Sequence, residues 1–190
     1  EELGMTNYPF TDLSEFKDIE SWDFYKLQRQ IGKSKEDILN ILRDMSRDNA
    51  RTPMQWTSDI QAGFTTGIPW ISVNPNYVNI NAKDALAEPQ SIFTTYQNLI
   101  RLRHDEDWVT TGETLFLDSV DSVIAYLRKT SHQTILVVIN LSSYPQNFES
   151  DFIIKRLIIG NVSFPDSLSM VLLQPWQAFA IEIDSVTRED

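Results

Sequence analysis

The stretch that fills positions 46–56 reads Ser46-Arg47-Asp48-Asn49-Ala50-Arg51-Thr52-Pro53-Met54-Gln55-Trp56. It follows a helical pattern and opens a polar segment, with several prolines and glycines, that continues to Asn81. A loop of this length is uncommon in a compact domain unless it is functional or is held by a neighbouring element. We expect its aromatic rings to pack within the loop rather than to stack on a ligand; these are Trp56, Phe64, Trp70 and Tyr77.

Helical patterns lie on both sides of this loop. Ser34 is a typical N-cap, and the apolar residues from Ile38 to Met45 recur at helical spacing behind it. A weaker pattern predicts a helix over about 21–31. A further helix is predicted over Ser91–His104, with its apolar residues on one side and basic residues near its end, where the helix dipole favours them.

The residue pattern of the sequence changes after Asp107. Short runs of β-forming residues, separated by turn residues, occupy 114–117, 123–128, 134–140, 153–159, 169–173 and 178–183. This spacing predicts an antiparallel β-sandwich of about six to eight strands. We place the domain boundary near residue 106. We expect most aromatic rings after it to be buried, with Trp176 packed between the sheets.

Composition excludes several classes of function. The net charge of −11 and the lack of a basic cluster argue against a nucleic-acid surface and against an anionic membrane surface. The chain has no cysteine, no apolar run of about 20 residues and no glycine-rich phosphate loop. His104 and His132 are isolated, so we expect surface positions, no metal site and no cofactor. A cytoplasmic location is expected.

The segment at 46–56 resembles a signature of glycoside hydrolase family 13, in the branch of oligo-1,6-glucosidases and dextran glucosidases. Three further stretches are similar to that branch in the same order, and they are Glu1–Asn7, Asp18–Ser21 and Ala62–Tyr77. The resemblance covers essentially the whole chain and is looser after residue 106. It implies an α+β fragment, in which residues 1–106 form the C-terminal end of a (β/α)8 barrel and residues 107–190 form an antiparallel β-sandwich.

The family hydrolyses glucosides with retention, using a nucleophilic carboxylate and a second carboxylic acid. By the resemblance, these carboxylates belong to earlier barrel strands and precede Glu1, so we assign no catalytic residue in this chain. Glu1 and Glu2 are poor substitutes, because adjacent residues of a strand point to opposite faces. We therefore expect the chain to be part of a longer α-glucosidase, to be inactive by itself, and to need the rest of the barrel as its missing partner. The first half should then expose apolar surface.

Two residues are candidates for substrate binding. By resemblance, Arg47 holds the terminal glucose, and a planar guanidinium suits both sugar hydroxyls and a carboxylate. The alternative for Arg47 is an ordinary ion pair with Asp44 or Asp48. By resemblance, Glu20 contacts the sugar on the leaving-group side and helps to select the α-1,6 linkage; its alternative is an exposed helix-start glutamate. We expect Arg51 and Asp48 to have structural roles.

Other functions remain open from the sequence. A trehalose-6-phosphate hydrolase would need a basic subsite for its phosphate, and a sucrose isomerase would carry determinants upstream. A non-catalytic relative of the same fold, or a carbohydrate-binding module formed by the second half, belongs to a different class. The leading expectation is an exo-acting α-glucosidase for short oligosaccharides with terminal α-1,6, and possibly α-1,4, bonds, without nucleic-acid or membrane partners.

Overall fold

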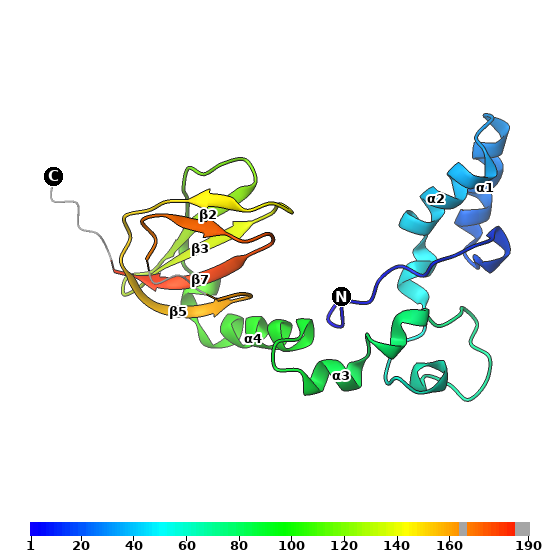
Figure 1. Ribbon diagram of the computed structural model, residues 1–190, viewed down its shortest axis with the longest axis horizontal. Coiled ribbons are helices and arrows are strands. Elements are labelled where there is room, and N and C mark those ends of the chain that lie inside the picture. Colours follow the sequence, from blue (N-terminus) through cyan, green and yellow to red (C-terminus); the bar gives the residue numbers. More distant parts are fainter. Residues whose placement is uncertain (164–166, 185–190) are drawn as a thin grey trace. The chain divides into compact units, whose positions relative to one another are not determined.

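The computed structural model describes residues 1–163 and 167–184. The chain divides into two compact units, one from Glu1 to Gln97 and the other from Asn98 onward. The division falls inside helix α4, which spans Ile92–Asp105. Figure 1 shows the helices and loops of the first unit and the strands of the second, and each unit is described by itself below.

The first unit is built from short helices whose starts follow local capping rules. Its elements are η1 (Leu13–Glu15), α1 (Ile19–Gln30), α2 (Lys35–Met45), η2 (Arg47–Arg51), η3 (Ile60–Gly63), η4 (Pro75–Val78) and α3 (Ala82–Ala87). The predicted cap of α2 is confirmed, because Ser34 Oγ accepts a hydrogen bond from the Asp37 amide at 3.1 Å. The predicted helix over 21–31 begins two residues earlier, because Asp18 caps it. The helix predicted over 91–104 is α4.

The long segment after residue 46 is ordered by hydrogen bonds to other parts of the unit. The amides of Trp56 and Thr57 both donate to the Ala62 carbonyl, at 2.9 and 3.0 Å. The Asn74 side chain, which is 2% exposed, donates to the carbonyls of Thr6 and Asn7. The Asn74 contacts hold this segment to the start of the chain, which is one of the two alternatives for so long a loop. The segment also contains η2, η3 and η4, and α3 follows it; the sequence pattern did not predict these elements.

Three of the four aromatic rings of this segment contradict the expectation of packing within the loop, whereas Tyr77 is partly buried. Trp56, Phe64 and Trp70 are 49%, 47% and 66% exposed. The core of the unit lies elsewhere, where η1 and its flanking residues meet one face of α2; its buried members are Phe10, Leu13, Phe16, Ile38, Leu39 and Leu42. Met45, which we expected on the same apolar face, is 79% exposed. The expected exposed apolar surface of the first half is thus present.

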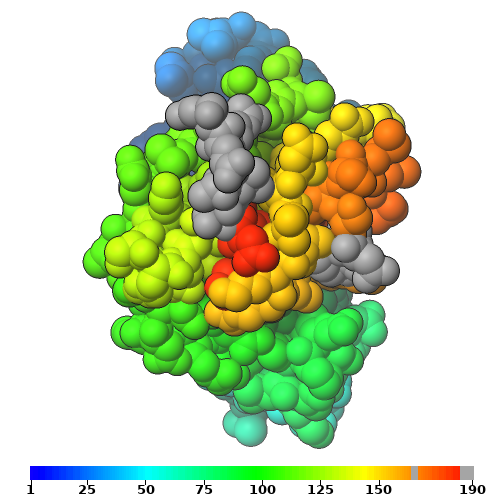
Figure 2. All heavy atoms as spheres, turned by 90° about the vertical axis from the view of Figure 1, so that its left-hand side faces the viewer, coloured from blue at the N-terminus to red at the C-terminus, as the bar shows by residue number. Residues whose placement is uncertain are grey.

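The second unit is an antiparallel β structure preceded by the short helix α5 (Asp107–Thr110). Its strands are β1 (Glu113–Phe116), β2 (Val123–Lys129), β3 (Thr134–Asn140), β4 (Gln146–Phe148), β5 (Ile154–Gly160), β6 (Val171–Leu173) and β7 (Ala178–Ile183). One sheet has the order β1-β2-β3-β7-β5, and a second pairs β4 with β6. All of these pairs are antiparallel. Figure 2 shows the end of β7, in red, beside β5, in yellow-orange.

The two sheets share one apolar core, as a β-sandwich requires. Alternate residues of β2, β3 and β7 face Phe148 of β4 and Val171 and Leu173 of β6. The six predicted strands are confirmed with small changes at their ends, while the three-residue β4 was missed because its polar sequence carries little β signal. Among the residues described, no helix is long and apolar enough to cross a membrane.

The burial expected for the aromatic rings of this unit is correct only in part. Trp108, Phe148 and Phe179 are buried, at 6%, 5% and 3% exposed. Trp176 is 58% exposed and does not lie between the sheets, because it occupies a turn between β6 and β7. Phe116 and Tyr144 are also largely exposed.

Candidate functional site

The two candidate residues come from the starts of α1 and η2. Asp18 caps α1, since its Oδ1 accepts a hydrogen bond from the Glu20 amide at 2.9 Å, and this places Glu20 in the first turn. Ser46 caps η2, since its Oγ accepts from the Asp48 amide at 3.2 Å, and this makes Arg47 the first residue of η2. The two caps are tied together, because the Ser21 and Ser46 hydroxyls lie 2.9 Å apart.

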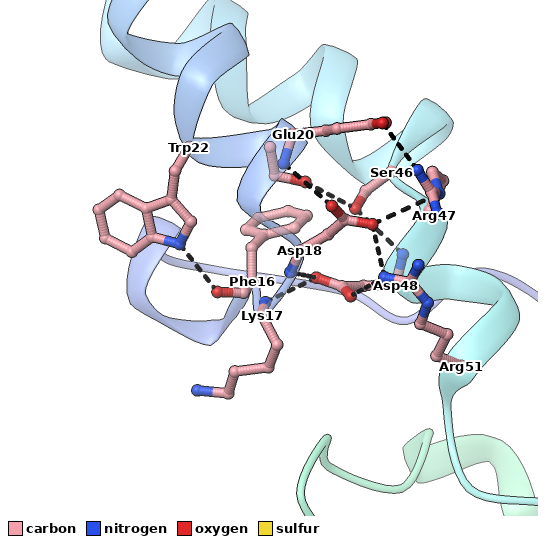
Figure 3. A network of polar contacts seen from close by, with 10 residues as sticks. Phe16, Lys17, Asp18, Glu20, Trp22, Ser46, Arg47, Asp48 and Arg51 are labelled. Carbon is pink, nitrogen blue, oxygen red and sulfur yellow. Dashed lines mark hydrogen bonds and ion pairs between the residues drawn. The ribbon is translucent and has the colours of Figure 1, made fainter.

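Arg47 and Glu20 form a direct ion pair (Figure 3). Arg47 Nη1 donates to Glu20 Oε1 at 2.7 Å, and Arg47 Nε lies 3.5 Å from Asp18 Oδ2. The sequence suggested Asp44 or Asp48 as ion-pair partners of Arg47, and neither is the partner in the part of the chain that the structure describes. The partners come from α1 instead, because η2 runs beside the start of that helix.

Next to this ion pair, Asp48 and Arg51 join η2 to the chain segment that leads into α1. Asp48 is fully buried, and its Oδ2 accepts from the amides of Lys17 and Asp18 at 2.6 and 3.0 Å. Arg51 Nη1 lies 2.5 Å from Asp18 Oδ2 and 3.5 Å from Asp48 Oδ1. The contacts of Arg51 and Asp48 agree with their expected structural roles, because they join η2 to the segment that enters α1.

The surroundings favour the charged forms of Asp18 and Arg47. The hydrogen bond from the Glu20 amide, together with Arg51 and Arg47, lowers the pKa of the Asp18 carboxyl although its burial acts in the opposite direction. The hydrogen bond and charge of Glu20, with a further contribution from Asp18, raise the pKa of Arg47. The charged forms of Asp18 and Arg47 therefore stabilise each other.

A groove of about 280 Å³ lies beside the ion pair. Its polar lining includes Asp18, Glu20 and Arg47, and its apolar lining consists of Phe24 of α1 with residues of α2. Arg47 and Glu20 have side chains 58% and 67% exposed. Within the described residues, no hydrogen bond or ion pair engages Arg47 Nη2 or Glu20 Oε2. The pair thus retains donors and acceptors that can bind hydroxyl groups.

The remaining candidates lie apart from this network. Glu1 and Glu2 are exposed, and Glu1 Oε2 accepts a hydrogen bond from the Tyr96 hydroxyl at 3.1 Å, which raises the pKa of Tyr96. His104 and His132 are exposed, as expected, and His132 Nε2 lies 3.6 Å from an Asp107 carboxylate oxygen. Over residues 1–163 and 167–184, no group of three or more His, Asp or Glu side chains could hold a metal ion.

Sequence reasoning missed the importance of Asp18. Its signal was present, since an aspartate directly before the first apolar residue of a helical pattern, with an acidic residue in the first turn, is typical of an N-cap. The contacts of Asp18 with Arg47 and Arg51 could not be read from that signal, because these residues are 29 and 33 positions away along the chain.

Comparison with known families identifies the class of protein to which this fold and site belong. The family model described as "Alpha amylase, catalytic domain" matches residues 1–112, so the chain belongs to the alpha-amylase family of glycoside hydrolases. The match ends directly before β1.

Two relatives show which enzymes of the family this chain resembles. The chain is 44% identical over 183 residues to the glucan 1,6-alpha-glucosidase of Streptococcus pneumoniae serotype 4, an alignment that covers 96% of this chain and 34% of the relative. It is 38% identical to the oligo-1,6-glucosidase of Parageobacillus thermoglucosidasius, with the same two coverages.

Solved structures of the same family resemble this chain closely. The trehalose-6-phosphate hydrolase of Bacillus licheniformis superposes with a TM-score of 0.87 at 38% identity. The trehalulose synthase of Pseudomonas mesoacidophila MX-45 superposes with a TM-score of 0.86 at 40% identity. Each comparison covers 96% of this chain and 34% of the other, so the chain spans about a third of the length of its relatives.

Proposed function

We propose that this chain is part of a retaining, exo-acting α-glucosidase that releases glucose from the non-reducing end of short oligosaccharides with terminal α-1,6 bonds, and possibly α-1,4 bonds. The observation that carries the proposal is the ion pair of Arg47 and Glu20, whose Nη2 and Oε2 atoms are available beside a groove. The names of the most similar relatives, glucan 1,6-alpha-glucosidase and oligo-1,6-glucosidase, support the same substrate class.

In this proposal Arg47 holds the terminal glucose and Glu20 binds the sugar on the leaving-group side. A guanidinium donates two parallel hydrogen bonds to neighbouring oxygens, and a carboxylate accepts hydrogen bonds from hydroxyls. The nucleophile and the acid of the retaining reaction are proposed to lie in the part of the protein that corresponds to the other two thirds of its relatives. The 190-residue chain alone would then release no glucose.

Two enzyme alternatives and two non-catalytic ones remain. Relatives include a trehalose-6-phosphate hydrolase of Bacillus subtilis, 37% identical, and the trehalulose synthase described above. The ionisable residues that line the groove are two carboxylates and one guanidinium, a balance that suits a neutral hydroxylated ligand better than a phosphate. This observation favours the glucosidase over the phosphate-specific enzyme. A non-catalytic subunit and a free carbohydrate-binding module remain weaker alternatives.

We also propose the division of the chain into the end of a (β/α)8 barrel, over 1–106, and a C-terminal β domain, over 107–190. The family match over 1–112 and the start of β1 at Glu113 support a boundary in this region. The rest of the barrel would then be the partner that covers the exposed apolar residues of the first unit. A cytoplasmic location is likewise proposed.

The test is substitution of the two residues in the full-length protein that carries this chain. Arg47→Ala removes charge-assisted hydrogen bonds worth about 1.5–3 kcal/mol, so kcat/KM should fall by roughly 10- to 100-fold on isomaltose and on maltose alike. Glu20→Ala should mainly lower the preference for isomaltose over maltose. Arg29→Ala, on the exposed far end of α1, is the matched control and should leave both rates unchanged. Unchanged kinetics of Arg47→Ala would contradict the proposal.

A further inference from the structure

The Asp18 side chain has a polar contact with both members of the proposed sugar-binding pair. Its Oδ1 accepts a hydrogen bond from the backbone of Glu20, and its Oδ2 faces Arg47 Nε at 3.5 Å (Figure 3). The same Oδ2 binds Arg51 Nη1 at 2.5 Å. One carboxylate therefore links the first turn of α1 with the first and last residues of η2.

Asp18 is also fixed in place. Its side chain is 6% exposed, and its backbone amide donates to the fully buried Asp48 carboxylate at 3.0 Å. Although Asp18 borders the groove, both of its carboxylate oxygens are already engaged by Glu20, Arg47 and Arg51, so it offers a sugar few free acceptors. It is well suited to act on its neighbours, because its own position is determined by several independent contacts.

Arg47, in contrast, needs such a support. Its side chain is long and 58% exposed, and ordering a side chain of this type costs much of its rotamer freedom. Its bond to Glu20 gives limited restraint, because Glu20 is itself 67% exposed. A buried carboxylate beside Nε restrains the guanidinium near its root and leaves Nη2 free. Holding a binding group in place before the ligand arrives reduces the cost of binding.

We infer that Asp18 is a positioning residue: its buried carboxylate holds Arg47, and through the start of α1 also Glu20, in the orientation that binds the sugar. The inference rests on the proposed function, because it concerns the same site. Asp18 contacts no substrate in this account, and its effect on the reaction passes through Arg47.

The test is a double-mutant cycle with Asp18→Asn and Arg47→Ala in the full-length protein, measured as kcat/KM on isomaltose. Asparagine also caps helices well, so this variant keeps the start of α1 and removes only the charge between the two arginines. Asp18→Asn should lower kcat/KM by about 10-fold, mainly through KM, in the protein that retains Arg47. In the Arg47→Ala background the same substitution should lower it by less than about twofold, because the residue through which Asp18 acts is absent.

Two controls separate this role from a purely structural one. Asp12→Asn changes another aspartate that caps a helix and pairs with a cation, Lys35, but lies away from Arg47, and it should leave kcat/KM unchanged. If Asp18→Asn does not fold, Asp18→Ser is the second variant, since serine also caps a helix without a charge.

The possible results have distinct meanings. An equal loss from Asp18→Asn with and without Arg47 would overturn the positioning role while leaving the proposed function intact. No loss from Asp18→Asn would do the same. No loss from Arg47→Ala alone would overturn both the proposed function and this inference.

Discussion

Trp176 adopts a backbone conformation that is unusual for its type. Its φ is 59°, and it is the third residue of a turn in which the Gln177 amide donates to the Gln174 carbonyl at 3.1 Å. With a proline before it, this geometry fits a type II turn, whose third position usually holds glycine. A left-handed backbone costs an L-residue about 1–2 kcal/mol. The backbone of the β unit is therefore locally strained at Trp176, whose side chain is exposed.

Comparing two substitutions isolates that strain. Trp176→Gly and Trp176→Ala both remove the indole ring, but only glycine relieves the backbone, so the glycine variant should be more stable than the alanine variant by about 1 kcal/mol. Urea unfolding followed by circular dichroism measures the difference. Equal unfolding midpoints would show that the turn does not hold a left-handed residue in solution.

At the scale of elements, the pairing of β5 with β7 includes an enclosed charge. Glu182 of β7 is 6% exposed and binds Lys155 and Arg156 of β5 through separate carboxylate oxygens, at 2.5 and 2.6 Å. The hydrogen bonds from Lys155 and then Arg156 lower the pKa of Glu182 below its usual value of 4.5, against the effect of burial. The ionised form is therefore favoured in the folded protein.

This shift predicts how the sandwich responds to acid. A carboxyl whose pKa is lower when folded adds stability above its unfolded pKa, and that stability is lost as pH falls through the folded pKa. Glu182→Gln should therefore be less stable than the unchanged protein at pH 7, and the difference should shrink below about pH 4.5. Hydrogen exchange of the β5 and β7 amides, at pH 7 and below about pH 4.5, measures this difference in stability. Glu113→Gln, on exposed β1, is the control without this pH dependence, and a constant difference for Glu182→Gln would refute the ion-pair explanation.

At the scale of the whole chain, the β unit extends beyond its strands. Trp108 of α5 is 6% exposed and packs with Ile135 of β3 and Ala180 of β7 on the outer face of the larger sheet. Arg128 of β2 donates to the carbonyls of Trp108 and Val109, each at 2.9 Å. The stable unit must therefore include residues before β1, although the family match ends just there.

Two polypeptides test where the unit begins. A polypeptide of residues 98–190 should fold with a cooperative urea transition, whereas one of residues 113–190 should be less stable by about 3 kcal/mol or more, because losing a buried tryptophan costs about that much. Trp108→Ala in the longer polypeptide should account for most of the difference. If the two lengths unfold at the same urea concentration, α5 is not part of the unit.

The sequence by itself determined the features that depend on neighbouring residues. Ser34 and the apolar spacing behind it specified α2, and the run over 134–140 specified β3, because capping and side-chain periodicity act within a few residues. The motif at 46–56 also singled out Arg47, and the segment at 18–21 singled out Glu20, although their ion pair was not foreseen.

Only the tertiary structure decided the features that depend on residues far apart. The pairing of β7 with β3, the contacts of Asp18 with two arginines and the packing of Trp108 against β3 and β7 all join positions more than twenty residues apart. The exposure of a side chain depends on which other residues pack against it. For this reason the sequence pattern wrongly predicted that Trp56, Trp70 and Trp176 would be buried. The physical reason is the same in each case. Local conformational preferences determine where a helix or strand forms, whereas the elements that pack against it depend on the free energy of the complete fold.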